Sequence, residues 1–193
     1  IHLTGPWREA APASVHLPAE IADFAEAGPF VYAGFGSMAA GDPRERGRIV
    51  VEAARRAGHR LLVATGLGGL AVSDDLQGDD VLVVGSVAHD LVLPRAVAAV
   101  HHGGIGTVQA ALRAGTVSIV VPFIADQPFW GAVLRRRALG PAAIPARRLT
   151  ADRLADALAA APRSAAAVAE VAARMPHDRG TDAALEAIAK LRD

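Results

Sequence analysis

Residues 97–107 read Val-Ala-Ala-Val-His-His-Gly-Gly-Ile-Gly-Thr, and this stretch decides the fold. Its first part is a short apolar run, typical of a strand that is buried on both faces of a sheet. A glycine-rich loop follows, and the residues from Gly104 to Ala114 have a helical pattern that stops at Gly115. A buried strand, a glycine loop and a helix in succession form the repeating unit of a parallel α/β sheet.

The same alternation of short apolar runs and longer amphipathic segments extends over most of the chain. Strands are expected at Phe30–Ala33, Arg60–Ala64, Val81–Val84, Val97–His101, Val117–Val121 and Gly140–Ile144. Helices are expected at Ala19–Ala27, Arg44–Ala57, Gly104–Ala114, Asp126–Arg137, Ala151–Ala160, Ser164–Arg174 and Thr181–Lys190. The pattern predicts a three-layer, doubly wound α/β domain with C-terminal helices, whose ligands lie at the carboxyl ends of the strands.

The composition excludes several classes of protein. The chain has 193 residues, enough for one domain, and is 52% hydrophobic and 21% charged, as globular domains are. Its 20 basic and 20 acidic residues balance, which argues against sequence-independent binding to nucleic acid or anionic membranes. Without cysteine it has no disulfide, no thiolate nucleophile and no Cys-based zinc site. No signal peptide or membrane span is apparent, so we expect a soluble, cytoplasmic protein.

The first loop of interest follows the strand at Phe30–Ala33. Residues 34–39, Gly-Phe-Gly-Ser-Met-Ala, satisfy the dinucleotide fingerprint G-x-G-x-x-A. That fingerprint also needs an acidic residue at the end of the second strand, where this chain has Val63-Ala-Thr-Gly66. An NAD site is therefore disfavoured. Two interpretations stay open: a turn in which Ser37 and backbone amides face a phosphate, and a tight glycine turn that serves packing.

The second and third loops follow the strands at Val97–His101 and Val117–Val121. Residues 101–107 place glycines and a threonine at a helix N-terminus, where amide donors and the helix dipole attract a diphosphate. Neighbouring histidines on a strand point to opposite faces, which argues against a metal pair, and both could be purely structural. In the third loop Asp126 and Gln127 suit vicinal sugar hydroxyls, although an Asp there could be only a helix cap.

These loops carry a family resemblance. They resemble the donor-binding signature of nucleotide-sugar glycosyltransferases with the GT-B fold, most closely the bacterial natural-product and sterol enzymes of family 1. The matching segments are Val100–Thr107, Leu112–Gly115 and Val120–Trp130, with further likeness at Gly34–Met38, Thr4–Trp7 and Leu149–Leu154. The likeness covers nearly all of the chain, and the His-His-Gly-Gly plus Asp-Gln combination is its most specific part.

The resemblance implies that residues 30–193 are a donor-binding domain, and that residues 1–29 contain an interdomain linker and a lead-in. It implies diphosphate contacts from Ser37, His101, Gly103, Gly104, Gly106 and Thr107. It implies nucleoside contacts from Val87 and Gln109, with Gln109 standing where relatives have a ribose-binding Glu, and sugar contacts from Asp126 and Gln127. The donor would be a UDP- or TDP-sugar, with no metal and no further cofactor.

In this family the sugar transfer inverts the anomeric carbon, and a His backed by an Asp deprotonates the acceptor hydroxyl. That base belongs to an N-terminal acceptor domain, which this chain lacks. The resemblance therefore implies half of a two-domain hexosyltransferase acting on a small-molecule acceptor. The 193-residue chain would bind the donor but not transfer sugar alone.

The chain departs from the family pattern at three places. Gly115-Thr-Val117 replaces Gly-Val-Pro, Leu91-Val-Leu-Pro94 replaces an aromatic run, and Leu67 stands where a Trp is common. The base and the hexose stay open as a result, and the acceptor stays open because the N-terminal domain would read it. Alternatives from other classes are a non-catalytic nucleotide-sugar sensor or subunit, an NAD-linked oxidoreductase half, and an epimerase, for which no acid–base pair is apparent.

Overall fold

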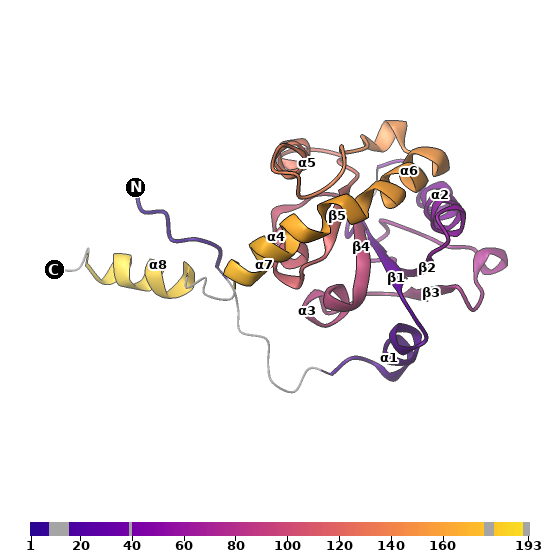
Figure 1. The fold of residues 1–193 in the computed structure, drawn as a ribbon, viewed down its shortest axis with the longest axis horizontal. Coiled ribbons are helices and arrows are strands. Elements are labelled where there is room, and N and C mark those ends of the chain that lie inside the picture. The colour runs from indigo at the N-terminus through magenta and orange to yellow at the C-terminus, as the bar shows by residue number, and fades with distance from the viewer. Residues whose placement is uncertain (8–15, 39, 176–179, 191–193) are drawn as a thin grey trace.

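The computed structural model describes residues 1–7, 16–38, 40–175 and 180–190. At its centre lies a five-stranded sheet with every pair of neighbouring strands parallel (Figure 1). The strands are β1 (Phe30–Gly34), β2 (Arg60–Ala64), β3 (Val81–Val84), β4 (Ala96–His101) and β5 (Val117–Val120), in the spatial order β3-β2-β1-β4-β5. The direction of strand addition reverses between β1 and β4, and this is where ligands of doubly wound sheets bind.

The strand expected at Gly140–Ile144 does not form, and that prediction is wrong. The segment does run beside the end of β5, because the Ile144 amide donates to the Val120 carbonyl at 2.9 Å. Pro141 and Pro145 lie before and after Ile144 in the sequence. Neither has an amide hydrogen to donate to the hydrogen-bond ladder of a sheet. The segment therefore follows β5 through isolated hydrogen bonds and adds no strand to the sheet.

All seven predicted helices form, with ends shifted by one or two residues at most. They are α1 (Ala19–Glu26), α2 (Pro43–Arg56), α4 (Ile105–Ala114), α5 (Gln127–Arg136), α6 (Ala151–Ala160), α7 (Ala165–Arg174) and α8 (Gly180–Ala189). The Asp42 side chain caps α2 by accepting from the Arg44 amide, and Gly115 ends α4 in the left-handed conformation. The predicted break between α7 and α8 includes residues 176–177, which lie outside the described residues.

One helix was not expected from the sequence. The short α3 (His89–Val92) and the 3₁₀ turn Leu93–Arg95 connect β3 to β4. Four residues are too few for a helical period to stand out from the neighbouring apolar runs. This short connection matters because it brings His89 to the carboxyl end of the sheet.

The strands are apolar on both faces because helices cover both faces. One face packs under α2, α6 and α7 through Val31, Ala33, Leu61 and Val63 among others, all of which are fully buried. The other face packs against α1 and α3 through Phe30, Tyr32, Leu62 and Ala99. The lead-in helix α1 belongs to this second layer, since Ile21 is buried and the Phe24 ring lies edge-on to Phe30. The predicted three-layer arrangement is confirmed.

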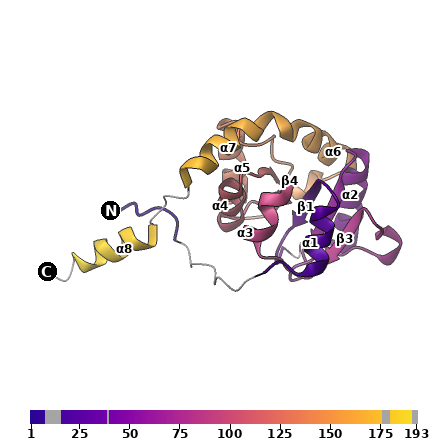
Figure 2. The ribbon, with the colours of Figure 1, turned by 60° about the horizontal axis from the view of Figure 1, so that its bottom comes forward.

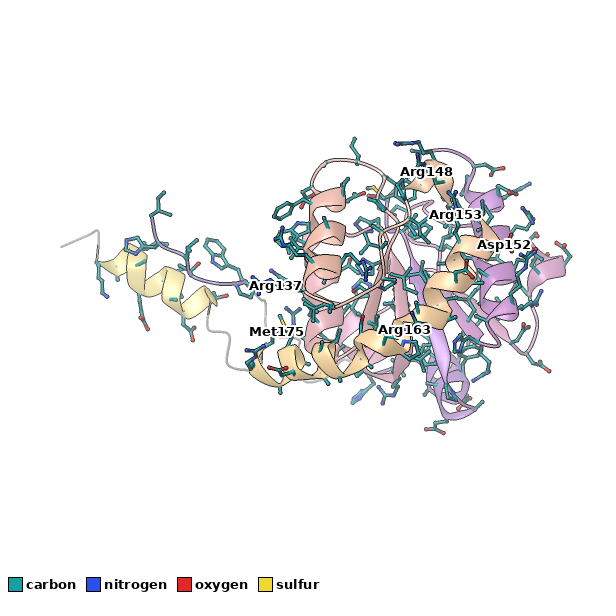
Figure 3. All side chains as sticks on the ribbon, turned by 45° about the horizontal axis from the view of Figure 1, so that its top comes forward. Arg137, Arg148, Asp152, Arg153, Arg163 and Met175 are labelled. Carbon is teal, nitrogen blue, oxygen red and sulfur yellow. The ribbon has the colours of Figure 1, made fainter. Side chains whose placement is uncertain are left out.

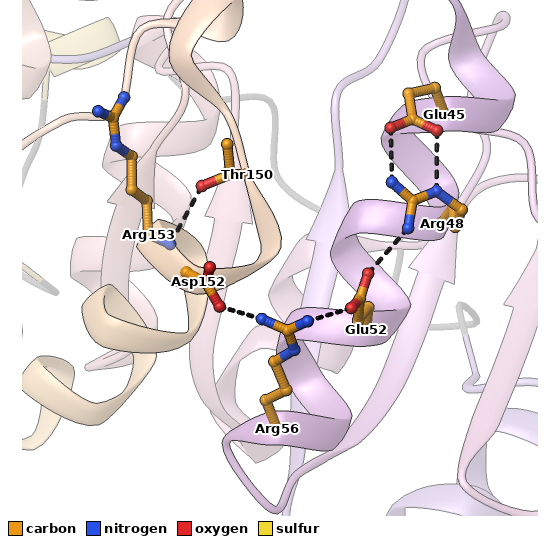
Figure 4. Close-up of polar contacts among 7 residues, drawn as sticks. All are labelled: Glu45, Arg48, Glu52, Arg56, Thr150, Asp152 and Arg153. Atoms are coloured by element: carbon orange, nitrogen blue, oxygen red, sulfur yellow. Dashed lines mark hydrogen bonds and ion pairs between the residues drawn. The ribbon is translucent and has the colours of Figure 1, made fainter.

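Exposed charges connect the two long helices of the first face. Figure 4 shows Arg56 of α2 between Glu52 and Asp152, so the ion pair to Asp152 joins α2 to α6. Arg48 pairs with Glu45 at 2.7 Å and with Glu52 at 2.9 Å on the same helix. Figure 3 places Asp152 and Arg153 on the first turn of α6 and Arg148 on the 3₁₀ turn before it, away from Met175 just after α7. Such exposed pairs contribute at most about 1 kcal/mol each, so buried packing dominates the α2–α6 contact.

The helix α8 and residues 1–7 lie together, off the α/β body (Figures 1 and 2). They are close enough that a Cβ atom added to Gly180 would lie 2.2 Å from the Pro6 carbonyl oxygen. We call this pair of segments the arm. Several of its large apolar side chains are exposed, namely Ile1, Leu3, Trp7, Leu185 and Ile188. Among the described residues, no helix is both long and apolar enough to cross a membrane.

Candidate functional site

The carboxyl ends of β1, β2, β3 and β4 surround a small pocket. Its volume is about 130 Å³, and it lies where the strand order reverses. The lining residues are Tyr32, Gly34, Gly36, Ala64, Gly66, Gly85, Ser86, Val87, His89, His102 and Thr107. The sequence analysis placed Val87 and Thr107 in the donor site, and the structure brings both of them to this pocket.

The glycines at the pocket make room for neighbouring side chains. A Cβ atom at Gly34 would lie 2.3 Å from the Tyr32 hydroxyl oxygen. At Gly104 it would lie 2.4 Å from Nε2 of His102. Both separations are far below van der Waals contact. The packing interpretation of the first loop therefore accounts for Gly34.

Tyr32 and His89 form a hydrogen bond that sequence reasoning missed. The Tyr32 hydroxyl and Nε2 of His89 are 3.0 Å apart, and their rings meet edge to face. Burial raises the pKa of Tyr32 to about 12 and lowers the pKa of His89. Both groups are therefore neutral near pH 7, and donation by the tyrosine O–H to Nε2 satisfies a buried donor.

The two neighbouring histidines have different environments. His101 is fully buried, and its Nδ1 accepts the Gly103 amide at 3.1 Å. Burial, with smaller contributions from His102 and His89, lowers the pKa of His101 to about 3. With Nδ1 as acceptor, the neutral ring carries its proton on Nε2, which has no partner among the described residues. His102 is half-buried and lines the pocket, with burial again lowering its pKa.

The first turn of α4 faces the same edge of the sheet. Gly104 caps the helix without a side-chain hydrogen bond, so the first-turn amides of Ile105, Gly106 and Thr107 have no partner within the helix. The helix dipole adds a partial positive charge at this end. Ser37 lies exposed on the turn after β1, and Gln109 is half-buried on α4. This edge has the donors and the polarity that suit a phosphate group.

Asp126 and Gln127 lie together on the loop after β5, but they have different partners. Gln127 is buried, and its Oε1 accepts from the amides of Phe123 and Ile124 at 2.7 and 3.0 Å. Its side-chain amide donates to the Met38 sulfur at 3.3 Å. Gln127 thus closes its own loop, within which Ala125 adopts a left-handed φ of 58°. Asp126 is exposed, and its Oδ2 accepts from Trp130 Nε1 at 2.7 Å.

Sequence reasoning missed Tyr32, His89, Trp130 and Arg46 as neighbours of the predicted site residues. Trp130 could have been found, because it follows Asp126 by one helical turn. Tyr32, His89 and Arg46 could not, because their contacts join elements that are distant in sequence. A larger cavity of about 560 Å³ lies between Ala40–Ile49, Pro122–Phe123 and Pro145–Leu149, outside the strand crevice.

Residues 72–191 match the family described as Erythromycin biosynthesis protein CIII-like, C-terminal domain. The chain belongs to this family. The EryCIII-like chain is 40% identical over 142 residues to sterol 3-beta-glucosyltransferase UGT80A2 of Arabidopsis thaliana, a match that covers 73% of the chain and 22% of that protein. It is 38% identical over 162 residues to the vancomycin aglycone glucosyltransferase of Amycolatopsis orientalis, with 82% and 37% covered. These relatives are glycosyltransferases, as the resemblance implies.

Solved structures agree on the fold. The glycotransferase of kitacinnamycin superposes on 97% of the EryCIII-like chain with a TM-score of 0.76 and 23% identity, and the match covers 48% of that protein. Arabidopsis thaliana UGT89C1 complexed with UDP-L-rhamnose gives a TM-score of 0.62 at 19% identity, over 75% of the chain and 37% of that protein. The fold is therefore that of one lobe of a GT-B glycosyltransferase. The chain spans less than half the length of these relatives.

Proposed function

We propose that this EryCIII-like chain is the donor-binding half of a glycosyltransferase, which holds a UDP- or TDP-sugar at the carboxyl edge of its sheet. The observation that carries the proposal is the uncapped N-terminus of α4, which opens beside the strand crevice and its pocket. Amide donors and a helix dipole at this place stabilise the charge of a diphosphate, both in the bound donor and in the leaving group.

The proposal assigns the diphosphate, the nucleoside and the sugar of the donor to different residues at this edge. The diphosphate lies at Ser37 and at residues 101–107, with Nε2 of His101 as a donor once the ligand is bound. The nucleoside lies toward Val87 and Gln109, and the sugar hydroxyls meet the free carboxylate oxygen of Asp126. Gln127 closes the loop that presents Asp126 to the sugar. Its side-chain amide donates to a sugar hydroxyl when it turns away from the Met38 sulfur.

The acceptor and its catalytic base belong to a second lobe in this proposal. Burial lowers the pKa values of His89, His101 and His102, the three histidines at the donor end. The chain therefore holds the donor and stabilises the departing nucleoside diphosphate. An inverting displacement additionally needs a lobe that presents a small-molecule hydroxyl and accepts its proton.

Thermal protection by nucleotides tests this proposal. UDP or TDP should raise the midpoint of thermal unfolding, because a ligand that binds only the folded chain stabilises it by mass action. At 100 times its dissociation constant the stabilisation is about 2.7 kcal/mol. Asp126→Asn should abolish the extra affinity that UDP-glucose has over UDP, while UDP itself binds as before. Protection by NAD but not by UDP or TDP would refute the proposal.

A stand-alone nucleotide-sugar sensor is the second candidate. Such a protein would bind the donor with the same residues but would need no second lobe. The exposed apolar side chains of the arm favour the transferase half, because they are placed where another structure can cover them. Sugar transfer by this chain alone, without any second lobe, would contradict the division of labour proposed above.

A further inference from the structure

Arg46 is a buried arginine at the second turn of α2. Only 7% of its surface is exposed. Its guanidinium donates three hydrogen bonds, all to backbone carbonyls: Nε to Gly69 at 2.9 Å, Nη2 to Met38 at 3.3 Å, and Nη1 to Ala40. An arginine at this position of an amphipathic helix normally extends into solvent, so its burial needs an explanation.

The three acceptors and one ring come from three different loops. Met38 and Ala40 follow β1, Gly69 follows β2, and Phe123 follows β5 with its ring 5.5 Å from the Arg46 guanidinium carbon. The guanidinium therefore lies at the carboxyl edge of the sheet and contacts the loops after β1, β2 and β5, which come from both sides of the reversal in strand order.

Further contacts extend this arrangement to the proposed ligand contacts. Met38 comes directly after Ser37, so the bond to its carbonyl restrains the Ser37 turn. The Met38 sulfur in turn accepts from Gln127, whose Oε1 holds the loop that presents Asp126. A single cation thus restrains the loops of both the diphosphate contact and the sugar contact.

The charge of Arg46 has no carboxylate partner at ion-pair distance in the described part of the chain. Burial lowers its pKa and the Asp42 carboxylate opposes that effect from a distance. A lysine could supply the charge but not three N–H groups in a fixed plane. Because the guanidinium is planar and rigid, the three carbonyls must take set positions around it. These positions fix the placement of the loops relative to one another.

We propose that Arg46 is a positioning residue for the nucleotide-sugar donor, which sets the mutual placement of the loops after β1, β2 and β5. This inference rests on the proposed function. It assigns a share of the affinity for the donor to a side chain whose hydrogen bonds all go to the protein's own backbone.

Arg60 provides a matched control at the opposite edge of the sheet. Its guanidinium also donates to two backbone carbonyls, those of Phe24 at 2.6 Å and Gly28 at 3.2 Å. It also lies over a phenylalanine ring, 3.8 Å from the Phe24 centroid. Arg60 begins β2, so its contacts lie at the amino end of the strands, away from the proposed site. Both arginines therefore donate to backbone carbonyls and lie over a phenylalanine ring, but at opposite ends of the strands.

The experiment compares Arg46→Ala and Arg60→Ala by calorimetric titration with UDP, at a temperature where urea unfolding shows each variant to be folded. We expect Arg46→Ala to bind UDP about tenfold more weakly or worse, since binding must then also order the loops that Arg46 holds in place in the wild type. Arg60→Ala should bind UDP within about twofold of the wild type, although its stability falls comparably. Millimolar methylguanidinium should restore the UDP affinity of Arg46→Ala.

Arg46→Lys keeps the experiment decisive if the alanine variant does not fold. It preserves charge and stem, and we expect it to remain folded and still to lose about tenfold in UDP affinity. Wild-type affinity in a folded Arg46→Lys or Arg46→Ala overturns the inference alone. An equal loss in Arg60→Ala does so too, because the effect would then follow stability. A wild-type chain that binds neither UDP nor TDP overturns the proposed function, and the inference with it.

Discussion

At the scale of single residues, His101 and His102 are adjacent in sequence but differ in what surrounds them. His101 is enclosed, with one ring nitrogen fixed by the Gly103 amide, and His102 forms part of the pocket wall. Any proton taken up by His101 would be an uncompensated charge inside the sheet, beside two further imidazoles. The neutral ring is consequently a condition for folding as well as a feature of the site.

This condition makes stability depend on pH. The pKa of His101 is lowered from 6.5 to about 3 in the folded chain, so between these values the unfolded chain binds more protons. Stability is therefore complete above about pH 6.5 and falls as the pH drops through this window. At pH 5 the loss from His101 should be about 2 kcal/mol relative to pH 7. Urea unfolding at the two pH values measures it.

The variant His101→Asn isolates this effect. Asparagine can accept the Gly103 amide without titrating, so the difference in unfolding free energy between pH 7 and pH 5 should shrink by about 2 kcal/mol. An unchanged pH dependence in His101→Asn would show that other groups govern acid sensitivity.

At the scale of elements, the helices show how packing overrides intrinsic preference. Gly47 lies in the middle of α2, where helix propensity alone favours alanine. A Cβ atom there would lie 2.0 Å from the Ala71 carbonyl oxygen, which belongs to the segment after β2. The glycine allows α2 to approach that segment closely, and the approach is what brings Arg46 within reach of Gly69.

Two glycine-to-alanine variants should therefore have effects of opposite sign. Gly47→Ala is expected to lower the free energy of unfolding by about 2 kcal/mol or more, because backbone atoms must move apart. Gly106→Ala, with nothing within 4 Å of the added Cβ, should raise it by up to about 1 kcal/mol through helix propensity. Urea unfolding of both variants checks this. A stabilised Gly47→Ala would mean that α2 can shift without loss.

The helices and strands also show which parts of the fold could be predicted from the sequence. The apolar runs predicted six strands, of which five form, and Gly115 predicted the end of α4, because both signals are local. The run at Gly140–Ile144 had the right hydrophobicity, but Pro141 and Pro145 removed the donors that a strand needs. For the site, the motifs placed His101, Thr107 and Asp126 at one edge. They gave no sign of Tyr32–His89 or Arg46, whose partners are set only by tertiary packing.

At the scale of the whole molecule, the arm stands apart from the α/β body. Leu185 and Ile188 of α8 are 62% and 53% exposed, whereas Val168 of α7 is fully buried. Two interpretations of the last helix compete, packing on its own domain or packing on a second lobe. The position of α8 off the body in Figures 1 and 2 favours the second.

Serine substitutions distinguish these interpretations. Leu185→Ser together with Ile188→Ser should change the free energy of unfolding by less than about 0.5 kcal/mol, as exposed substitutions do. Val168→Ser should lower it by more than about 2 kcal/mol, because it places a hydroxyl in the core. Urea unfolding of the 193-residue chain gives both values. A loss above 1 kcal/mol in the α8 double variant would mean that this face is already buried within the chain.

The loops at the carboxyl edge are in contact through their backbones. The Gly36 carbonyl accepts the Leu67 amide at 3.1 Å, and both Gly66 and Gly69 lie against it so closely that a Cβ would fall within 3 Å of its oxygen. Loops joined in this way have few alternative conformations left. A ligand that enters the crevice therefore orders little additional chain. The unfavourable entropy of binding should come mainly from the flexible ligand, and the protein should resist compression at this edge as it does in its core.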